Sequence, residues 1–345
     1  MRTYLITGGA GFIGSNFIRM LLREEPSARV INLDSLTYAG NLTNLGEAAQ
    51  DPRHIFVRGD ICDQALVTRL FTENEIDCVV NFAAESCVDR SISDPQLFVR
   101  TNVLGTVFLL DCARAAWEEG GSYRPEVRFV QISTDEVYGS LGAAGYFTEQ
   151  MPLRARNPYS ASKAAADQLA YACFATYGLP VNITRCTNNY GPCQHPEKLI
   201  PLTVSRALAH REIPVYGDGM QVRDWLYVED HCRAVLQVLR NGTPGEIYNI
   251  GGHCERRNLE VIRSVLACLR AHSVCAGGEE LIRHVADRKG HDRRYGIDPR
   301  KLEEELGWRP QVPFEEGLNR TMEWYLGHRD RLADSAPPAE EKTRP

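Results

Sequence analysis

The stretch "ITGGAGFIGSN", residues 6–16, joins a short apolar run, "TYLIT" (3–7), to an amphipathic segment, "NFIRMLLRE" (16–24). It spaces three glycines as G-x-x-G-x-x-G, namely Gly8, Gly11 and Gly14. Between a strand and a helix, such glycines let backbone N–H groups and the helix N-terminus approach a pyrophosphate. Turns also need glycine for purely conformational reasons. The position between the first strand and the first helix nevertheless favours a dinucleotide site.

The alternation of strand and helix continues outward from this stretch. Further strands are predicted at "RVINLD" (29–34), "HIFVRGD" (54–60), "CVVNFAA" (78–84), "VRFVQIST" (127–134) and "PVNITRC" (180–186). Strands that are apolar along their whole length indicate a parallel sheet covered by helices on both faces. We therefore predict an α/β fold with a Rossmann-type doubly wound parallel sheet.

After Cys186 this pattern breaks up, and Pro and Gly cluster in "NNYGPCQHPEKLIP" (188–201). We predict that a smaller mixed α/β domain begins here. "DWLYVEDHCRAVLQVL" (224–239) and "EIYNIGG" (246–252) read as a helix and a strand that return to the main domain. The predicted domains are 1–185 plus about 224–250 for the sheet and 186–223 plus 251–330 for the smaller domain. The charged, Pro-rich tail, 331–345, is expected to be disordered.

Composition excludes several classes of protein. The 345 residues are 43% hydrophobic and carry a formal net charge of −6, which argues against general nucleic-acid binding. No apolar run approaches the roughly 20 residues that cross a bilayer, and no signal sequence precedes the first strand. We expect a soluble, cytoplasmic protein. The eleven cysteines form no C-x-x-C pair, so neither a metal site nor a disulfide framework is expected.

Asp34 ends the second predicted strand, about twenty residues after the glycine stretch. An acid there binds the adenosine ribose hydroxyls and would repel a 2′-phosphate, which favours NAD over NADP. Asp60 and Ile61, after the third strand, are predicted to flank the adenine. Strand ends rich in alanine are common in any sheet, but Phe82, Ala83 and Ala84 end the fourth strand where a cofactor would lie.

"YSASK" (159–163) places Tyr159 and Lys163 four residues apart, on one face of a predicted helix. A tyrosine is a poor base at neutral pH unless a neighbouring ammonium lowers its pKa. A Ser or Thr at the end of a nearby strand, Ser133 or Thr134, could share the substrate oxygen. Surface helices carry many such pairs by chance. Downstream of a dinucleotide fold, the set Thr134, Tyr159 and Lys163 indicates oxidation of an alcohol.

"ISTDEVYG" (132–139) then places two acids side by side at a strand end, Asp135 and Glu136. Two solvated acids in a loop would be the ordinary explanation. In a cleft, they would serve as an acid and a base.

These residues resemble the extended short-chain dehydrogenase/reductase family and, within it, nucleotide-sugar 4,6-dehydratases of the dTDP-glucose type. The resemblance covers about 1–328 and rests on "TGGAGFIGSN", "LTYAGN", "GDICD", "AAES-VDRSI", "ISTDEVYG", "NPYSASKA", "NNYGP-QHPEKLIP", "QVRDWLYVEDH", "YNIGG" and "GHDRRY". It implies a homodimeric lyase that uses NAD to turn dTDP-glucose into the 4-keto-6-deoxy sugar. Tyr159, with Lys163 and Thr134, would act at C4, Glu136 as the base at C5 and Asp135 as the acid at C6.

The resemblance also implies further contacts to both ligands. On the cofactor side these are Phe12, Ile13, Ser35, Leu36, Thr37, Ser86, Thr101 and Asn189. On the nucleotide-sugar side they are Ser86, Thr134, Asn188, Lys198, Leu199, Pro214, Tyr216, Arg223, Asn258, Arg288 and His291, with the two arginines suited to phosphate oxygens.

Four positions depart from the family pattern: Cys87 for His, Cys193 for an aromatic residue, Cys254 for Asn and Lys289 for Pro. The residues assigned to chemistry are intact, so the reaction type is not affected. Three alternatives stay open: a UDP-sugar dehydratase, a 4-epimerase that shares only the oxidation at C4, and a catalytically silent NAD-binding regulator. Thymine and uracil differ by one methyl group, which is worth only about 1–3 kcal/mol in a pocket.

Overall fold

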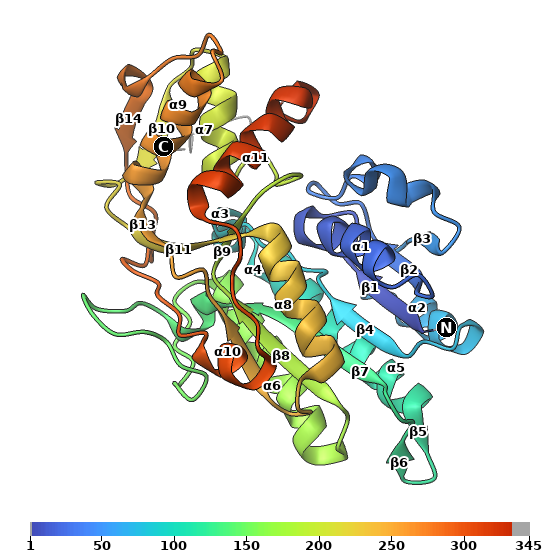
Figure 1. Cartoon of the computed structure of the whole chain (residues 1–345). Helices are drawn as coiled ribbons and strands as arrows, with labels where there is room; N and C mark the ends of the chain where they lie inside the picture. Colours follow the sequence, from blue (N-terminus) through green and yellow to red (C-terminus); the bar gives the residue numbers. More distant parts are fainter. Residues whose placement is uncertain (1, 333–345) are drawn as a thin grey trace, which may run out of the picture.

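The computed structural model describes residues 2–332 and is built around a parallel sheet (Figure 1). Its seven strands lie in the order β12-β8-β7-β4-β1-β2-β3. Their bounds are β1 (Thr3–Thr7), β2 (Arg29–Asp34), β3 (His54–Arg58), β4 (Cys78–Asn81), β7 (Arg128–Thr134), β8 (Val181–Cys186) and β12 (Ile247–Ile250). Every neighbouring pair is parallel. This confirms the predicted fold class.

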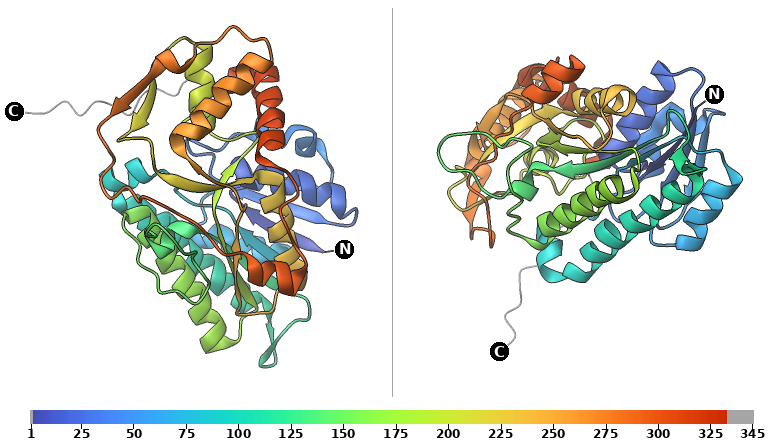
Figure 2. Two further views of the ribbon diagram at one scale, coloured as in Figure 1. Left: turned by 60° about the vertical axis from the view of Figure 1, so that its left-hand side comes forward. Right: turned by 90° about the horizontal axis from the view of Figure 1, so that it is seen from below.

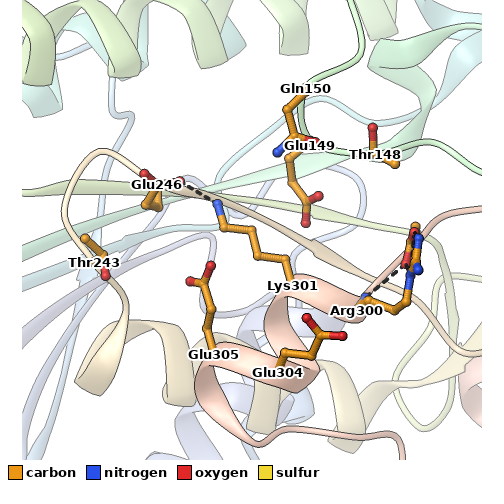
Figure 3. Close-up of a pocket in the computed structure, with 10 residues that line it drawn as sticks. Thr148, Glu149, Gln150, Thr243, Glu246, Arg300, Lys301, Glu304 and Glu305 are labelled. Atoms are coloured by element: carbon orange, nitrogen blue, oxygen red, sulfur yellow. Dashed lines mark hydrogen bonds and ion pairs between the residues drawn. The ribbon is translucent and has the colours of Figure 1, made fainter.

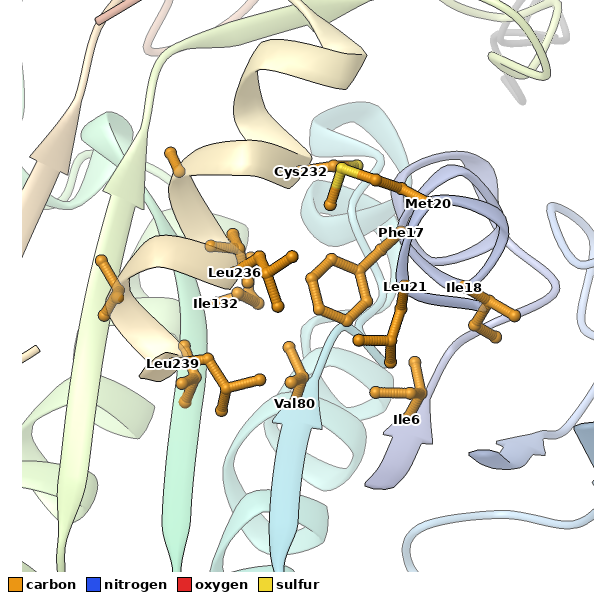
Figure 4. Close-up of a cluster of buried hydrophobic side chains, with 14 of the residues drawn as sticks. Ile6, Phe17, Ile18, Met20, Leu21, Val80, Ile132, Cys232, Leu236 and Leu239 are labelled. Carbon is orange, nitrogen blue, oxygen red and sulfur yellow. The ribbon is translucent and has the colours of Figure 1, made fainter. Parts of the chain in front are cut away.

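Helices cover both faces of the sheet, because the buried side chains of each strand alternate between two cores. One face packs against α1 (Phe12–Glu24), α8 (Val228–Asn241) and the 3₁₀ segment η1 (Leu42–Gln50). Phe17 of α1 lies beside Leu236 of α8 and above Val80 of β4 on this face (Figure 4). The opposite face packs against α2 (Gln64–Glu73), α5 (Thr106–Trp117) and α6 (Pro158–Tyr177).

A smaller region with a third core adjoins the carboxyl side of this sheet (Figures 1 and 2). It contains the three-stranded sheet β13-β11-β9 and the parallel pair β10-β14. The bounds are β9 (Asn188–Tyr190), β10 (Ile213–Tyr216), β11 (Val222–Tyr227), β13 (Glu255–Arg257) and β14 (Ile282–Val285), with α7 (Leu199–Leu208), α9 (Asn258–Ala271) and α11 (Phe314–Gly327).

Short elements connect these parts. They are α3 (Val88–Ser93), α4 (Pro95–Phe98), the π-helical turn η2 (Val99–Gly105), the hairpin β5 (Glu118–Glu119) and β6 (Ser122–Tyr123), η3 (Asp135–Tyr138), η4 (Glu279–Leu281), α10 (Arg300–Leu306) and η5 (Arg329–Leu332). The tail expected to be disordered lies outside the described residues from 333 onward, and its first two residues belong to η5.

One predicted element differs from the structure. The helix expected over 224–239 begins only at Val228, because residues up to Tyr227 form the buried strand β11. The apolar and aromatic run "DWLY" therefore takes the extended form and pairs with β9 and β13. No helix within residues 2–332 is long and apolar enough to span a membrane.

The strand order places a crevice where this fold binds ligands. From β1 the chain moves to β2 and β3 on one side of the sheet, whereas β4, β7 and β8 follow on the other. Helices therefore depart in opposite directions beside β1, and a crevice opens at the carboxyl ends of the strands.

Candidate active site

A cavity of about 390 Å³ occupies this crevice. All five residues predicted for catalysis line it: Thr134, Asp135, Glu136, Tyr159 and Lys163. So do Gly8, Gly11, Phe12, Ile13, Gly14, Asp34, Ser35, Thr37, Asp60, Ile61, Phe82, Ala83, Ala84, Ser86, Thr101 and Asn189 of the predicted cofactor set. Leu36 is the one member of that set that does not line the cavity.

The glycine turn at the entrance to α1 is too tight for side chains. A Cβ on Gly14 would lie 2.3 Å from the carbonyl oxygen of Gly8, and a Cβ on Gly8 would lie 2.7 Å from the backbone nitrogen of Ala83. Gly8 also has φ +65°, a conformation that favours glycine. The backbone at the start of α1 is therefore bare toward the cavity, as a bound pyrophosphate requires.

Asp34 ends β2 and is held in place by the backbone. Its Oδ2 accepts the N–H of Ala10 at 2.8 Å, and its Oδ1 accepts the N–H of Leu36 at 2.8 Å. Each carboxylate oxygen can still accept a second hydrogen bond from a ribose hydroxyl. The bare glycine turn and this fixed acid together fit NAD.

Thr134 ends β7 and caps η3, which places both acids at the carboxyl edge of the sheet. Its hydroxyl accepts a hydrogen bond from the N–H of Glu136 at 3.2 Å and donates one to Asp135 Oδ1 at 3.3 Å. Asp135 is 2% exposed, and its Oδ2 has no hydrogen-bond partner. Burial raises the pKa of Asp135 to about 8, with the Glu136 charge adding to the effect. Asp135 therefore stays protonated at neutral pH.

Glu136 has a different environment. Burial raises its pKa, but the charges of Arg223, Lys198 and Arg288 and a hydrogen bond from Asn157 act in the opposite direction. The Asn157 amide lies 3.4 Å from Glu136 Oε2. Three cations thus favour the ionised form of Glu136, whereas Asp135 is influenced by one cation, Arg223, and by the acids Glu136 and Asp224.

Tyr159 and Lys163 lie on the face of α6 that meets the strand ends. The Lys163 ammonium donates to the carbonyl of Ile132 at 2.5 Å. Burial raises the pKa of Tyr159 well above its ordinary value, and the charges of Glu136 and Asp135 raise it further. A hydrogen bond with Thr134 lowers the pKa but does not offset this rise, so the lowering expected from a neighbouring ammonium is not found in the chain alone.

The predicted nucleotide-sugar contacts divide into two groups. Ser86, Thr134, Asn188 and Lys198 line the cavity. Leu199, Pro214, Tyr216, Arg223, Asn258, Arg288 and His291 do not line it. The second group adjoins the first nonetheless, since the charges of Arg223 and Arg288 act on Glu136.

The side chains expected to grip phosphate already have partners within the chain. Arg223 donates to the carbonyls of Val222 and Asp292 at 2.8 and 2.9 Å. Arg288 forms a two-pronged ion pair with Asp89, at 2.6 and 2.7 Å. A phosphate on Arg288 would therefore have to share the guanidinium with Asp89.

Several residues of the cavity were missed by the sequence predictions. They are Leu33, Ala39, Gly40, Gly59, Glu85, Leu97, Ile132, Cys186, Thr187, Gln194, His195 and Glu197. The carboxyl end of β8 could have indicated Cys186 and Thr187, because all parallel strands end at the same edge. Leu97 comes from the short helix α4 and carries no signal in the sequence.

The four departures from the family pattern lie in different surroundings. Cys87 caps α3, and the charges of Glu197 and Lys198, which line the cavity, act on its thiol. Cys193 is buried, and Cys254 donates its backbone N–H to Asp224 at 2.6 Å. Lys289 is exposed. Within residues 2–332, no three His, Cys, Asp or Glu side chains are grouped as a metal site.

A second cavity, of about 590 Å³, lies between α10 and the segments around Glu149 and Glu246 (Figure 3). None of the predicted site residues lines it. Its charges pair with one another, as in the contact of Lys301 with Glu246 at 2.5 Å. The crevice at the strand ends is therefore the candidate active site.

Comparisons with known proteins agree with this geometry. A family model described as GDP-mannose 4,6 dehydratase matches residues 5–321. The dTDP-glucose 4,6-dehydratase of Xanthomonas campestris pv. campestris is 54% identical over 330 residues, which is 94% of this chain and 93% of that protein. The chain belongs to the dTDP-glucose 4,6-dehydratase family. This confirms the resemblance found in the sequence.

Solved structures place the chain in the same family. The dTDP-glucose 4,6-dehydratase of Streptomyces venezuelae, solved with NAD bound, is 50% identical with a TM-score of 0.88, covering 95% of this chain and 98% of that one. A UDP-glucose 4-epimerase of Thermus thermophilus, also solved with NAD, shares the fold at 31% identity with a TM-score of 0.83, covering 94% and 99%. The dehydratase is thus considerably more similar in sequence than the epimerase.

Proposed function

We propose that this chain dehydrates dTDP-glucose to its 4-keto-6-deoxy product, with NAD as a bound reagent that is regenerated in each cycle. The observation that carries the proposal is the meeting of Asp135 and Glu136 with Tyr159 and Lys163 in one cavity beside the glycine turn. Oxidation of an alcohol needs only the second pair. An acid and a base in addition are what an elimination requires.

The side chains divide the proton transfers among them. Tyr159, beside the Thr134 hydroxyl and the Lys163 ammonium, takes the proton of the C4 hydroxyl. The 4-ketone acidifies the C5 proton, which Glu136 removes. Asp135, protonated at neutral pH, gives its proton to the C6 hydroxyl so that it leaves as water. A proton then returns to C5.

We propose that the glycine turn, Asp34 and the ends of β3 and β4 hold NAD. NAD supplies the acceptor for the hydride of C4 and the donor that returns it to C6. Asp34 would take the ribose hydroxyls, and the start of α1 the pyrophosphate. The nucleotide-sugar would extend from Thr134 toward Ser86, Asn188 and Lys198, and beyond them to Arg223 and Arg288.

Incubation of the purified protein with dTDP-glucose tests the proposal. A product lighter by one water in the mass spectrum is expected, whereas an unchanged mass would favour the 4-epimerase. Parallel kinetics with UDP-glucose and UDP-N-acetylglucosamine test the nucleotide, since a higher kcat/KM for either would move the assignment to a UDP-sugar dehydratase. Unchanged turnover in Tyr159→Phe would contradict the mechanism.

We also propose a homodimer that works in the cytoplasm, where nucleotide sugars and NAD are metabolites. The dimer is supported by apolar side chains exposed on the α5 and α6 side of the molecule. Val99, Leu104, Tyr171 and Tyr177 are 55%, 44%, 46% and 52% exposed. A monomeric protein seldom exposes such a group on adjacent elements.

A further inference from the structure

The face of α6 that carries Tyr159 and Lys163 carries a third ionisable side chain, Asp167. The three residues follow one another at intervals of four, so they stack along one side of the helix. Lys163 is 4% exposed and Asp167 is 0% exposed. The mechanism assigns no role to Asp167, although burying a carboxylate is costly unless it is paired.

Few groups besides Asp167 favour the charged form of Lys163. Its ammonium donates to the neutral carbonyl of Ile132, and burial lowers its pKa. The groups packed around Tyr159, Lys163 and Asp167 come from three other elements: Ser133 and Thr134 of β7, Asp135 and Glu136 of η3, and Cys186 of β8. Of these, Cys186 acts on Lys163 itself. Asp135 is protonated at neutral pH, and the Cys186 thiol, with a pKa of about 12, is neutral. Asp167 is the carboxylate whose charge raises the pKa of Lys163.

Arg185 of β8 holds Asp167 from the other side. Its Nε donates to Asp167 Oδ2 at 2.9 Å, and both side chains are almost fully buried. Its Nη1 donates to the Tyr138 hydroxyl at 2.9 Å, which in turn donates to Asn249 at 2.8 Å. Burial raises the pKa of Asp167, whereas Arg185 and Lys163 favour its ionised form. Asp167 thus pairs directly with the buried Arg185 and lies one helical turn from the buried Lys163.

We propose that Asp167 is a positioning residue that keeps Lys163 protonated beside Tyr159, and that Arg185 holds Asp167 as a carboxylate. The inference rests on the proposed function, in which the Lys163 ammonium assists Tyr159. It assigns supporting roles to two residues in the core, on α6 and β8, that do not line the cavity.

The substitution Asp167→Asn tests the proposal through the pH profile of kcat. Activity that requires protonated Lys163 falls as pH rises through the pKa of that lysine. Without the Asp167 charge that pKa is lower, so the alkaline limb should move down by about one pH unit. Labelling of Lys163 with acetic anhydride, which attacks only the neutral amine, should move by the same amount when read by peptide mass spectrometry.

Asp167→Asn leaves the buried Arg185 unpaired and could prevent folding. The double variant Asp167→Asn/Arg185→Gln removes both charges and should shift in the same direction by a smaller amount. Tyr138→Phe is the matched control, because it removes a contact of Arg185 and leaves all three charges in place. Its alkaline limb and labelling should coincide with those of the wild type.

The inference would be overturned if Asp167→Asn and the double variant both matched the wild type in the pH dependence of labelling and of kcat. The labelling distinguishes this failure from failure of the proposed function. A wild-type protein that does not dehydrate dTDP-glucose contradicts the function alone, whereas the titration of Lys163 is read without turnover.

Discussion

Asp135 and Glu136 are adjacent in the chain, and burial raises the pKa of both while the charge of Arg223 lowers it. Their remaining neighbours differ. Asp135 is buried beside Glu136 and Asp224, and both carboxylates raise its pKa. Glu136 is influenced by three cations, which favour its ionised form. Residues placed so that one is protonated and the other ionised at the same pH can act as acid and base. The structure thus supplies a physical basis for dividing the roles, which sequence spacing cannot supply.

The division predicts different defects in two isosteric variants. Glu136→Gln should lose exchange of the C5 proton with deuterium oxide, because no base remains at C5. Asp135→Asn should retain that exchange while water loss falls by about 10²–10⁴-fold. Mass spectrometry of substrate and product follows both steps, and NAD binding controls for folding. Loss of exchange only in the Asp135 variant would reverse the assignment.

Asp135→Asn should also stabilise the protein. The pKa of Asp135 is about 8 in the folded chain and about 4 in the unfolded chain, so the folded state binds more protons between these values. The wild type therefore loses stability as pH rises, by up to about 1.4 kcal/mol per unit. The variant lacks this loss, so its gain in Tm should be larger at pH 9 than at pH 5. An equal gain at both values would contradict the titration.

At the scale of elements, the turn into α1 depends on Gly14 for space. Alanine has the better helix propensity, by about 1 kcal/mol. The Cβ of an alanine at this position would lie 2.3 Å from the carbonyl oxygen of Gly8. Because that oxygen belongs to the backbone and not to a flexible side chain, the clash outweighs the gain in helix propensity. Gly14→Ala should lower stability by about 1–3 kcal/mol and weaken NAD binding.

Thermal melting with and without NAD checks this prediction. Gly142→Ala serves as the control, because its Cβ would meet nothing within 4 Å. The control should leave both Tm and NAD affinity unchanged. If Gly14→Ala binds NAD as tightly as the wild type does, the close approach of Gly14 to Gly8 is not required for NAD binding.

The sequence correctly predicted elements for which composition and hydrophobic pattern indicate the same secondary structure. The run "TYLIT" is apolar throughout, and its five residues are buried in β1 as expected. The start of β11 was missed because "DWLY" precedes a helix without a break, and its pairing with β9 and β13 is a tertiary effect. The contact of Arg288 with Asp89 joins residues 199 positions apart, so no local pattern could indicate it.

At the scale of the molecule, the cavity lies where the sheet and the smaller region meet. Lys198, which precedes α7, donates to the carbonyl of Ser86 at 3.2 Å, and Arg288 pairs with Asp89 of α3. Residues from separate parts of the chain thus join where the crevice meets the smaller region. The predicted division of the chain into two domains stays a prediction. Leu302 and Trp308, which fall in the second predicted domain, pack into the core of the large sheet.

The dimer prediction concerns the face formed by η2, α5 and α6, which lies below the sheet in the right-hand view of Figure 2. Because Val99 and Leu104 lie exposed on η2, replacing both by glutamate would bury charge in a dimer but cost little in a monomer. Light scattering during gel filtration should give a dimer for the wild type and a monomer for Val99→Glu/Leu104→Glu.

Tyr146 provides the matched control for that experiment. It is 53% exposed, but it lies in the loop before Phe147 and contacts the guanidinium of Arg294. Tyr146→Glu should therefore leave the dimer intact, because it introduces the same side chain outside η2, α5 and α6. A monomeric wild type would contradict the homodimer. A double variant that stays dimeric would show that the interface lies elsewhere on the molecule. Retained dehydration in the monomer would further show that each cavity is complete within one chain.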